Sequence, residues 1–176
     1  MKVLFLLMAM IDAWDLWEQP PRIRYLDAER RPTWAFYDFL LTKRDGSKTA
    51  VAIKPAAVVE ATGFRQELEL IRASTPLNFA DDVALVTDRS FTASEARNAE
   101  RLHDFRRHPD QEADQIVADK LTDLGAEVTI GDLASSTGLD GRGFRAAFRL
   151  IYSGVARVLD AGDITPQTRI IVGGAQ

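Results

Sequence analysis

The sequence predicts an α/β fold, with a sheet flanked by helices in the first half and a small, mainly helical part in the second. Short apolar and aromatic runs bounded by turn residues, typical of strands, occupy much of the chain before residue 88. After Thr92 the pattern changes to charged segments of helical periodicity. We therefore predict two domains, residues 1–92 and 93–176, although no low-complexity linker separates them.

Bulk composition excludes several classes of protein. The chain has 176 residues, 46% of them apolar, which is enough to bury a core. Cysteine is absent, so disulfides and thiolate zinc sites are ruled out. We interpret the two histidines, His103 and His108, as solvated surface residues. A net charge of −4 argues against general coating of nucleic acid, so any DNA contact must be local.

The first ten residues superficially resemble a signal peptide, because Lys2 precedes a short apolar run. The run is too short to span a membrane and lacks a small-x-small cleavage site. We instead predict a buried helix that Gln19-Pro20-Pro21 ends, since proline cannot continue the hydrogen-bond ladder. We expect a cytoplasmic protein with no membrane partner.

The rest of the chain is expected to form mainly strands before residue 88 and helices after Thr92. The expected strands are Arg22 to Tyr25, Thr33 to Lys43, Thr49 to Lys54 and Val83 to Thr87. The expected helices are Val58 to Ser74, Ala93 to Arg106 and Asp110 to Leu124, the last with Asp110 as N-cap and Gly125 after its end.

Asp38 and Lys54 are the candidate catalytic residues, at the ends of two strands joined by an Asp45-Gly46 turn. They converge only if the hairpin register puts them on one face. A three-residue loop of Asp45, Gly46 and Ser47 would set Asp38 opposite Lys54, and Leu40 opposite Ala52. The alternative is a plain hairpin in which the two charged residues are incidental.

Such a pair indicates metal-assisted hydrolysis of a phosphodiester. Asp38 would bind Mg²⁺ or Mn²⁺, and Lys54 would orient or deprotonate the attacking water. One aspartate is a small ligand set, although Mg²⁺ usually takes only one or two protein carboxylates.

Four short motifs follow one another in the first half of the chain: Trp14 to Tyr25, Tyr37 to Leu41, Asp45-Gly46 and Val51 to Pro55. In order and spacing they resemble the N-terminal domain of TnsA-type transposon endonucleases, which have a PD-(D/E)XK fold, so the resemblance implies a restriction-endonuclease-like mixed sheet flanked by helices. The resemblance covers about the first half of the chain. It implies that Asp38 is the metal-binding aspartate and Lys54 the catalytic lysine, with double-stranded DNA as substrate and a transposase or other transposition-complex subunit as partner.

Two positions depart from the family pattern. Ala52 stands where the family has an acid or glutamine, and no glutamate occurs before Glu18, although the family uses one in an upstream helix. Either the chain begins too late to include that helix, or the site has decayed. A migrated carboxylate could come from Glu60, Glu67 or Glu69, but helical glutamates usually form a solvated face.

The C-terminal segment predicts a winged helix-turn-helix. Val128 to Leu139 predicts a short helix that begins at a threonine cap and ends in the Ser136-Thr137-Gly138 turn, and a second helix is expected from about Asp140 to Ser153. Val155 to Leu159 and Arg169 to Val172 would form a hairpin wing. The family resemblance also implies a winged-helix-like C-terminal part.

Three arginines on the second helix are the candidate DNA-binding residues. Arg142, Arg145 and Arg149 follow one another at intervals of three and four, which places them on one helical face. From Glu127 to Val172 five arginines balance five acids, so basic character is concentrated rather than general. The alternative is a module used for protein contacts.

Two function classes therefore stay open. The chain is an endonuclease subunit, or a catalytically impaired DNA-binding or assembly factor that keeps the nuclease fold and the winged helix. We interpret Trp14, Trp17 and Trp34 as core or partner-facing anchors rather than as a stacking platform for single strands.

Overall fold

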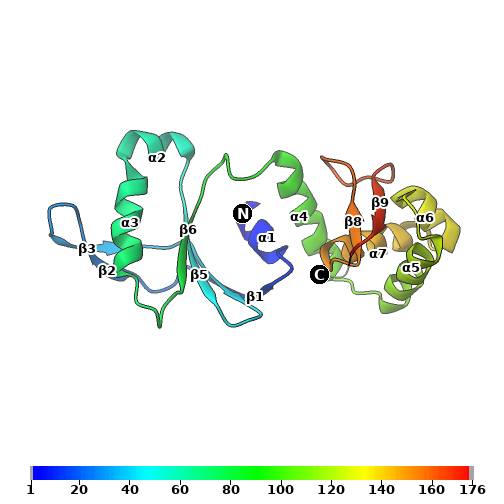
Figure 1. The fold of residues 1–176 in the computed structure, drawn as a ribbon, viewed down its shortest axis with the longest axis horizontal. Coiled ribbons are helices and arrows are strands. Elements are labelled where there is room, and N and C mark those ends of the chain that lie inside the picture. Colours follow the sequence, from blue (N-terminus) through cyan, green and yellow to red (C-terminus); the bar gives the residue numbers. More distant parts are fainter. Residues whose placement is uncertain (1, 175–176) are drawn as a thin grey trace. The chain divides into compact units, whose positions relative to one another are not determined.

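A computed structural model describes residues 2–174 of the chain, which divide into two compact units (Figure 1). The α/β unit is Asp12–Thr92, and the helical unit combines the residues up to Ile11 with those from Ala93 onward. The division after residue 92 falls where the sequence indicated. The first eleven residues, however, do not belong to the first domain as predicted, because the N-terminal helix packs against the helix that begins at Ala93.

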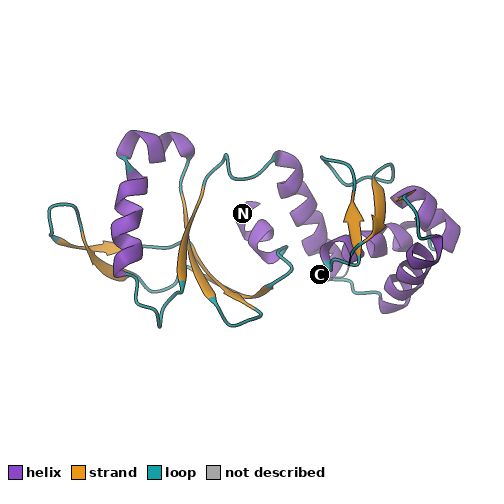
Figure 2. Ribbon diagram, viewed as in Figure 1, coloured by secondary structure: helices purple, strands orange, loops and turns teal. Residues whose placement is uncertain are grey.

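A four-stranded sheet forms the centre of the α/β unit (Figure 2). Its strands, in spatial order, are β1 (Ala13–Glu18), β4 (Phe39–Lys43), β5 (Lys48–Ile53) and β6 (Asp82–Val86). Strand β4 is antiparallel to β1 and to β5, whereas β6 runs parallel to β5. The sheet is therefore mixed, as the sequence predicted, and β5 is paired on both sides.

The β4–β5 hairpin closes one residue earlier than predicted. The Lys43 amide donates to the Ser47 carbonyl at 2.8 Å, which leaves Arg44, Asp45 and Gly46 in the loop. Gly46 has a φ of +87°, a value that glycine adopts at little cost. Leu40 consequently lies opposite Ala50. The predicted pairing of Leu40 with Ala52, and of Asp38 with Lys54, is wrong by two residues, and a shift of two keeps each side chain on its predicted face.

Two helices, α2 (Ala56–Thr62) and α3 (Phe64–Ser74), follow β5 where a single helix was expected. Gly63 lies between them with a φ of +65°, so the chain turns there. One apolar cluster joins the helices to the sheet, and its members include Leu40, Ala50, Ala52, Val59, Phe64, Leu68, Ile71 and Val83. The core of the α/β unit therefore lies between this sheet face and the two helices.

A separate antiparallel hairpin is formed by β2 (Ile23–Leu26) and β3 (Pro32–Ala35). The strand predicted from Thr33 to Lys43 is thus interrupted between β3 and β4. Side chains on one face of this hairpin are buried in the apolar cluster of the unit, as Ile23, Tyr25 and Ala35 show. The Tyr25 hydroxyl also donates to the carboxylate of Glu67 on α3.

The helical unit contains most of the helices. They are α1 (Lys2–Met8), α4 (Ala93–Arg106), α5 (Gln111–Leu124), α6 (Ile130–Thr137) and α7 (Asp140–Tyr152). Three short strands, β7 (Val128–Thr129), β8 (Ala156–Val158) and β9 (Arg169–Val172), form an antiparallel sheet in the order β7-β9-β8. Within residues 2–174, no helix is long and apolar enough to cross a membrane.

Capping residues define the helix ends of this unit. Asp110 accepts the Ala113 amide at 3.2 Å, and Thr129 accepts the Asp132 amide at 3.1 Å. Gly125 and Gly138 adopt left-handed conformations after α5 and α6. These four positions are those that the sequence indicated, because caps depend on local chemistry.

The N-terminal helix is shorter than predicted. It ends at Met8, and Ala13–Glu18 forms strand β1 on the edge of the sheet instead of continuing the helix to the prolines. Pairing with β4 supplies backbone partners for this segment, so tertiary structure overrides the helical pattern. Trp14 and Trp17 are 71% and 51% exposed, which excludes the core role considered for them.

Gly143 allows α6 and α7 to approach closely. A Cβ added there would lie 3.0 Å from the Cβ of Ala134, whereas one added at Gly141 would meet nothing nearer than 3.6 Å. We expect Gly143→Ala to destabilise the helical unit by about 1–2 kcal/mol through overpacking. The matched Gly141→Ala should leave stability unchanged or slightly raised. Thermal unfolding followed by circular dichroism measures both, and equal stability of the two variants would contradict this packing.

Candidate functional site

Asp38 and Lys54 lie at the ends of neighbouring strands in the α/β unit. The Asp38 carboxylate accepts the backbone amide of Ile53 at 2.6 Å, and the Asp38 amide donates to the Val51 carbonyl at 2.9 Å. The Lys54 amide donates to the Val86 carbonyl of β6 at 3.1 Å. The carboxylate therefore binds the residue immediately before Lys54. The two predicted catalytic residues are at the same edge of the sheet, although they are not direct cross-strand partners.

The side chain of Lys54 is directed at the helical layer. Its ammonium nitrogen lies 4.5 Å from the centre of the Phe64 ring, at the start of α3. An ammonium over an aromatic face is attracted by the ring quadrupole. This contact gives Lys54 a structural role that does not require a metal.

Ala52 occupies the position at which TnsA-type endonucleases, which the sequence resembles, carry an acid or glutamine. It is only 4% exposed, and it belongs to the same apolar cluster as Val59 and Phe64. A carboxylate at this position would have to be desolvated among apolar side chains. The second acid is therefore absent, and its surroundings are apolar.

None of the three helical glutamates contacts Asp38. Glu60 forms an ion pair with Arg89 at 2.6 Å, Glu67 accepts the Tyr25 hydroxyl, and Glu69 lies 3.8 Å from Arg72. Across the described residues, no three Asp, Glu or His side chains are grouped as ligands of a metal ion. A divalent cation at Asp38 would meet one carboxylate, one oxygen of which already accepts the Ile53 amide.

Two of the three predicted DNA-binding arginines are held by acids of α5 and its cap. Arg142 donates to Asp110 at 2.7 Å and to Glu112 at 2.6 Å. Arg149, whose side chain is only 10% exposed, donates to both carboxylate oxygens of Asp114 at 2.6 to 3.1 Å. The pairs attach α7 to the start of α5, where acids also interact favourably with the helix dipole.

Arg145 differs from its two neighbours on α7. Its side chain is exposed, and no ion pair to it occurs in the described part of the chain. In the small sheet, Arg169 is paired with Asp160 at 2.7 Å and with Glu127 at 2.8 Å. Most of the arginines between β7 and β9 therefore serve internal ion pairs, and Arg145 is the α7 arginine with free donors.

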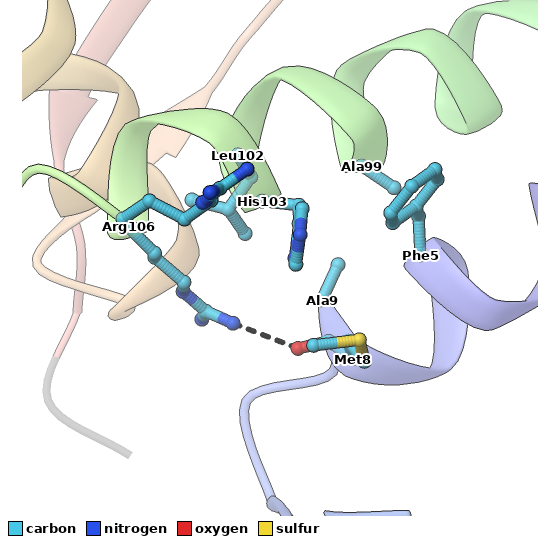
Figure 3. A pocket seen from close by; sticks show the side chains of 8 residues that line it. Phe5, Met8, Ala9, Ala99, Leu102, His103 and Arg106 are labelled. Carbon is cyan, nitrogen blue, oxygen red and sulfur yellow. Dashed lines mark hydrogen bonds between the residues drawn. The ribbon is translucent and has the colours of Figure 1, made fainter. Parts of the chain in front are cut away.

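A small pocket in the helical unit contains one of the histidines (Figure 3). Its volume is about 190 Å³, and Phe5 and Met8 of α1 line it together with Leu102 and His103 of α4. His103 is half-buried, with its ring 5.0 Å from that of Phe5, so it is less solvated than the sequence indicated. Arg106 also lines the pocket and donates to the Met8 carbonyl at 2.7 Å.

Sequence reasoning missed a basic and aromatic surface on the β2–β3 hairpin. Arg24 lies opposite Trp34 in the ladder, and Arg22 places its guanidinium 4.2 Å above the centre of the Trp34 ring. The signal was the alternation of arginines with apolar residues from Arg22 to Tyr25. The same alternation that predicts a strand also places Arg22 and Arg24 on the face opposite Ile23 and Tyr25.

The sequence matches none of the protein-family models and none of the curated proteins with which it was compared. The resemblance to TnsA-type endonucleases therefore stays a prediction that depends on the four motifs and on the placement of Asp38 and Lys54.

Burial of Ala52 gives a direct test of this site. We expect Ala52→Glu to lower the free energy of unfolding of the α/β unit by more than about 2 kcal/mol, because an unpaired carboxylate enters an apolar cluster. Ala57→Glu, on the exposed side of α2, is the matched control and should change stability little. Chemical denaturation checks both, and a fully stable Ala52→Glu variant would show that this position faces a polar site.

The ion pair between Asp110 and Arg142 predicts that the stability of the helical unit falls at low pH. Hydrogen bonds from Arg142 and from the Ala113 amide lower the pKa of Asp110 from 3.8 to about 2. The stabilisation from this ion pair is fully present above pH 3.8, where the Asp110 carboxyl is ionised in the unfolded chain as well. It is lost as the pH falls toward 2 and the carboxyl is protonated in the folded protein. Thermal unfolding between pH 5 and 2 should thus be less acid-sensitive in Asp110→Asn, which keeps a capping side chain. The exposed Asp123→Asn should behave as the parent protein does.

Proposed function

We propose that this chain is a DNA-binding assembly factor of a transposition complex, related to TnsA-type endonucleases, that does not cut DNA on its own. The observation that carries the proposal is the burial of Ala52 beside Lys54. Metal-assisted cleavage needs ligands that hold the ion and neutralise charge on the transferring phosphate. Here the position of the second acid is a methyl group in the apolar core, and Lys54 is engaged by Phe64.

The mixed sheet of the α/β unit supports a relationship to a nuclease fold. Asp38 and Lys54 lie at adjacent strand ends in the order that the family motifs require, with helices following β5. An ancestral site that has lost its second carboxylate would keep this arrangement, because Asp38 still caps the Ile53 amide and Lys54 still packs on Phe64.

The order of elements in the helical unit supports a DNA-binding role. Helix α5, strand β7, helices α6 and α7, and strands β8 and β9 follow one another as in a winged helix, and α7 would be the recognition helix. Arg145 is the exposed arginine of α7 that can reach a phosphate or a base edge of double-stranded DNA. Because Arg142 and Arg149 hold α5, their function would be to orient the helix that presents Arg145.

A second candidate is metal-dependent cleavage at transposon ends. The contact between the Asp38 carboxylate and the amide that precedes Lys54 favours it, because it brings both residues to one edge. Asp38 would then bind Mg²⁺ or Mn²⁺ with water and phosphate oxygens completing the coordination, and Lys54 would orient or deprotonate the attacking water.

Incubation with supercoiled plasmid and Mn²⁺, alone and with a transposase partner, separates the two candidates. The proposal predicts no nicking above that of Asp38→Ala and Lys54→Ala. It also predicts duplex binding that Arg145→Ala weakens severalfold, with a salt slope smaller by about one. The exposed Arg107→Ala of the same unit is the matched control. Nicking by the parent protein that is abolished in both Asp38→Ala and Lys54→Ala would establish the second candidate. A protein that binds no DNA duplex would refute the proposal.

A further inference from the structure

The exposed face of the β2–β3 hairpin carries a group of side chains that the proposed function does not use. We call this group the hairpin face, and it consists of Arg22, Arg24, Trp34 and Phe36. Successive residues of a strand point to opposite faces. Because Ile23, Tyr25 and Ala35 are buried in the core of the unit, the residues between and beside them are turned to solvent.

Two aromatic rings on the hairpin face are partly open to solvent, although the Arg22 guanidinium lies over the Trp34 ring. Phe36 is 70% exposed and Trp34 is 46% exposed. Phe36 also lines a hollow of about 480 Å³ together with Arg22, Asp38 and Pro20. That volume is in the range of small-ligand sites. An aromatic ring, a guanidinium and the carboxylate of Asp38 therefore border a space that is large enough for a nucleobase.

The positive charge of the hairpin face is not neutralised internally. Within residues 2–174, neither Arg22 nor Arg24 forms an ion pair, in contrast to Arg142 and Arg149 on α7. The nearby hairpin turn has acids, but Arg31 binds both Asp27 at 2.9 Å and Glu29 at 2.7 Å. In a chain of net charge −4, two adjacent unpaired arginines are a local site for an anion.

We propose that the hairpin face binds single-stranded nucleic acid, which gives Trp34 the stacking role that its sequence context alone did not indicate. Unpaired bases stack on Phe36 and Trp34, and Arg22 and Arg24 contact the backbone phosphates, which is the combination of rings and cations that single strands require. A duplex keeps its bases stacked on each other, so it cannot use the rings. The choice of DNA as the nucleic acid rests on the proposed function. The inference adds a second type of ligand, an unpaired strand, and a second binding surface in addition to α7.

Fluorescence anisotropy with a labelled oligothymidylate of about 20 nucleotides tests this inference. We expect Trp34→Ala and Phe36→Ala each to weaken binding by roughly 5- to 100-fold, the usual effect of removing one stacking ring. The double substitution Arg22→Ala/Arg24→Ala should reduce the salt slope by about 1.4, since single strands contribute about 0.7 per phosphate. Exposed side chains of the same unit serve as controls, and Trp14→Ala and Arg31→Ala should bind as the parent protein does.

A spectroscopic readout locates the contact. Replacing Trp14 and Trp17 with phenylalanine leaves Trp34 as the remaining tryptophan. Oligothymidylate should quench its emission, and an oligouridylate that does the same would extend the ligand to RNA. A duplex of the same length should not quench it.

Three results would overturn the inference: no binding of either single strand, binding that is indifferent to both aromatic substitutions, or equal quenching by duplex. The proposed function fails separately. If the protein binds duplex through Arg145 but binds no single strand through the hairpin face, only the hairpin inference is overturned. Hairpin-dependent binding of single strands without any duplex binding refutes only the proposed role of α7.

Discussion

Strand β5 is the constraint on which the α/β unit depends. It is hydrogen-bonded to β4 on one side and to β6 on the other, so its register cannot change without breaking both ladders. That register turns Ala52 into the apolar cluster and brings Lys54 over the ring of Phe64. It also places the Ile53 amide where the Asp38 carboxylate accepts it. The strand that would carry a catalytic acid and lysine is therefore fixed mainly by packing.

In the helical unit, ion pairs fix the position of α7 against α5, as packing fixes β5 in the α/β unit. The acids at the start of α5 hold Arg142 and Arg149, and Arg149 in particular is nearly buried. Removing Asp114 would leave the nearly buried charge of Arg149 without compensation, which makes Arg149 a poor candidate for release to DNA. Arg145 and the arginines of the hairpin face are among those that form no ion pair within residues 2–174. Net charge alone does not show this, because it counts paired and unpaired arginines alike.

Local signals in the sequence predicted much of the fold. The caps at Asp110, Thr129 and Gly138 were predictable because each depends on a side chain or a φ value within a few residues. The strands and the helices after residue 92 followed from periodicity, whereas the mixed sheet was implied by the family resemblance. The register of the β4–β5 hairpin did not, since loops of equal length starting at adjacent residues are hard to distinguish without the Lys43–Ser47 pairing.

Long-range partners explain what sequence reasoning missed. Ala13–Glu18 becomes a strand because β4 pairs with it, and nothing in the segment itself indicates that partner. The identity of the acids that hold Arg142 and Arg149 depends on how α5 packs on α7, at sequence separations above thirty residues. Asp38 and Lys54 could be named from motifs, whereas the apolar surroundings of Ala52 required the positions of α2 and α3.

A titration of isotope-labelled protein with Mn²⁺, followed by the broadening of backbone amide resonances, tests the central claim most directly. If the edge formed by Asp38 and Lys54 no longer holds a metal, sub-stoichiometric Mn²⁺ should broaden no amide selectively at Asp38, Ile53 or Lys54. Selective broadening centred on these three amides, and its loss in Asp38→Ala, would contradict the claim that packing has replaced catalysis at this edge.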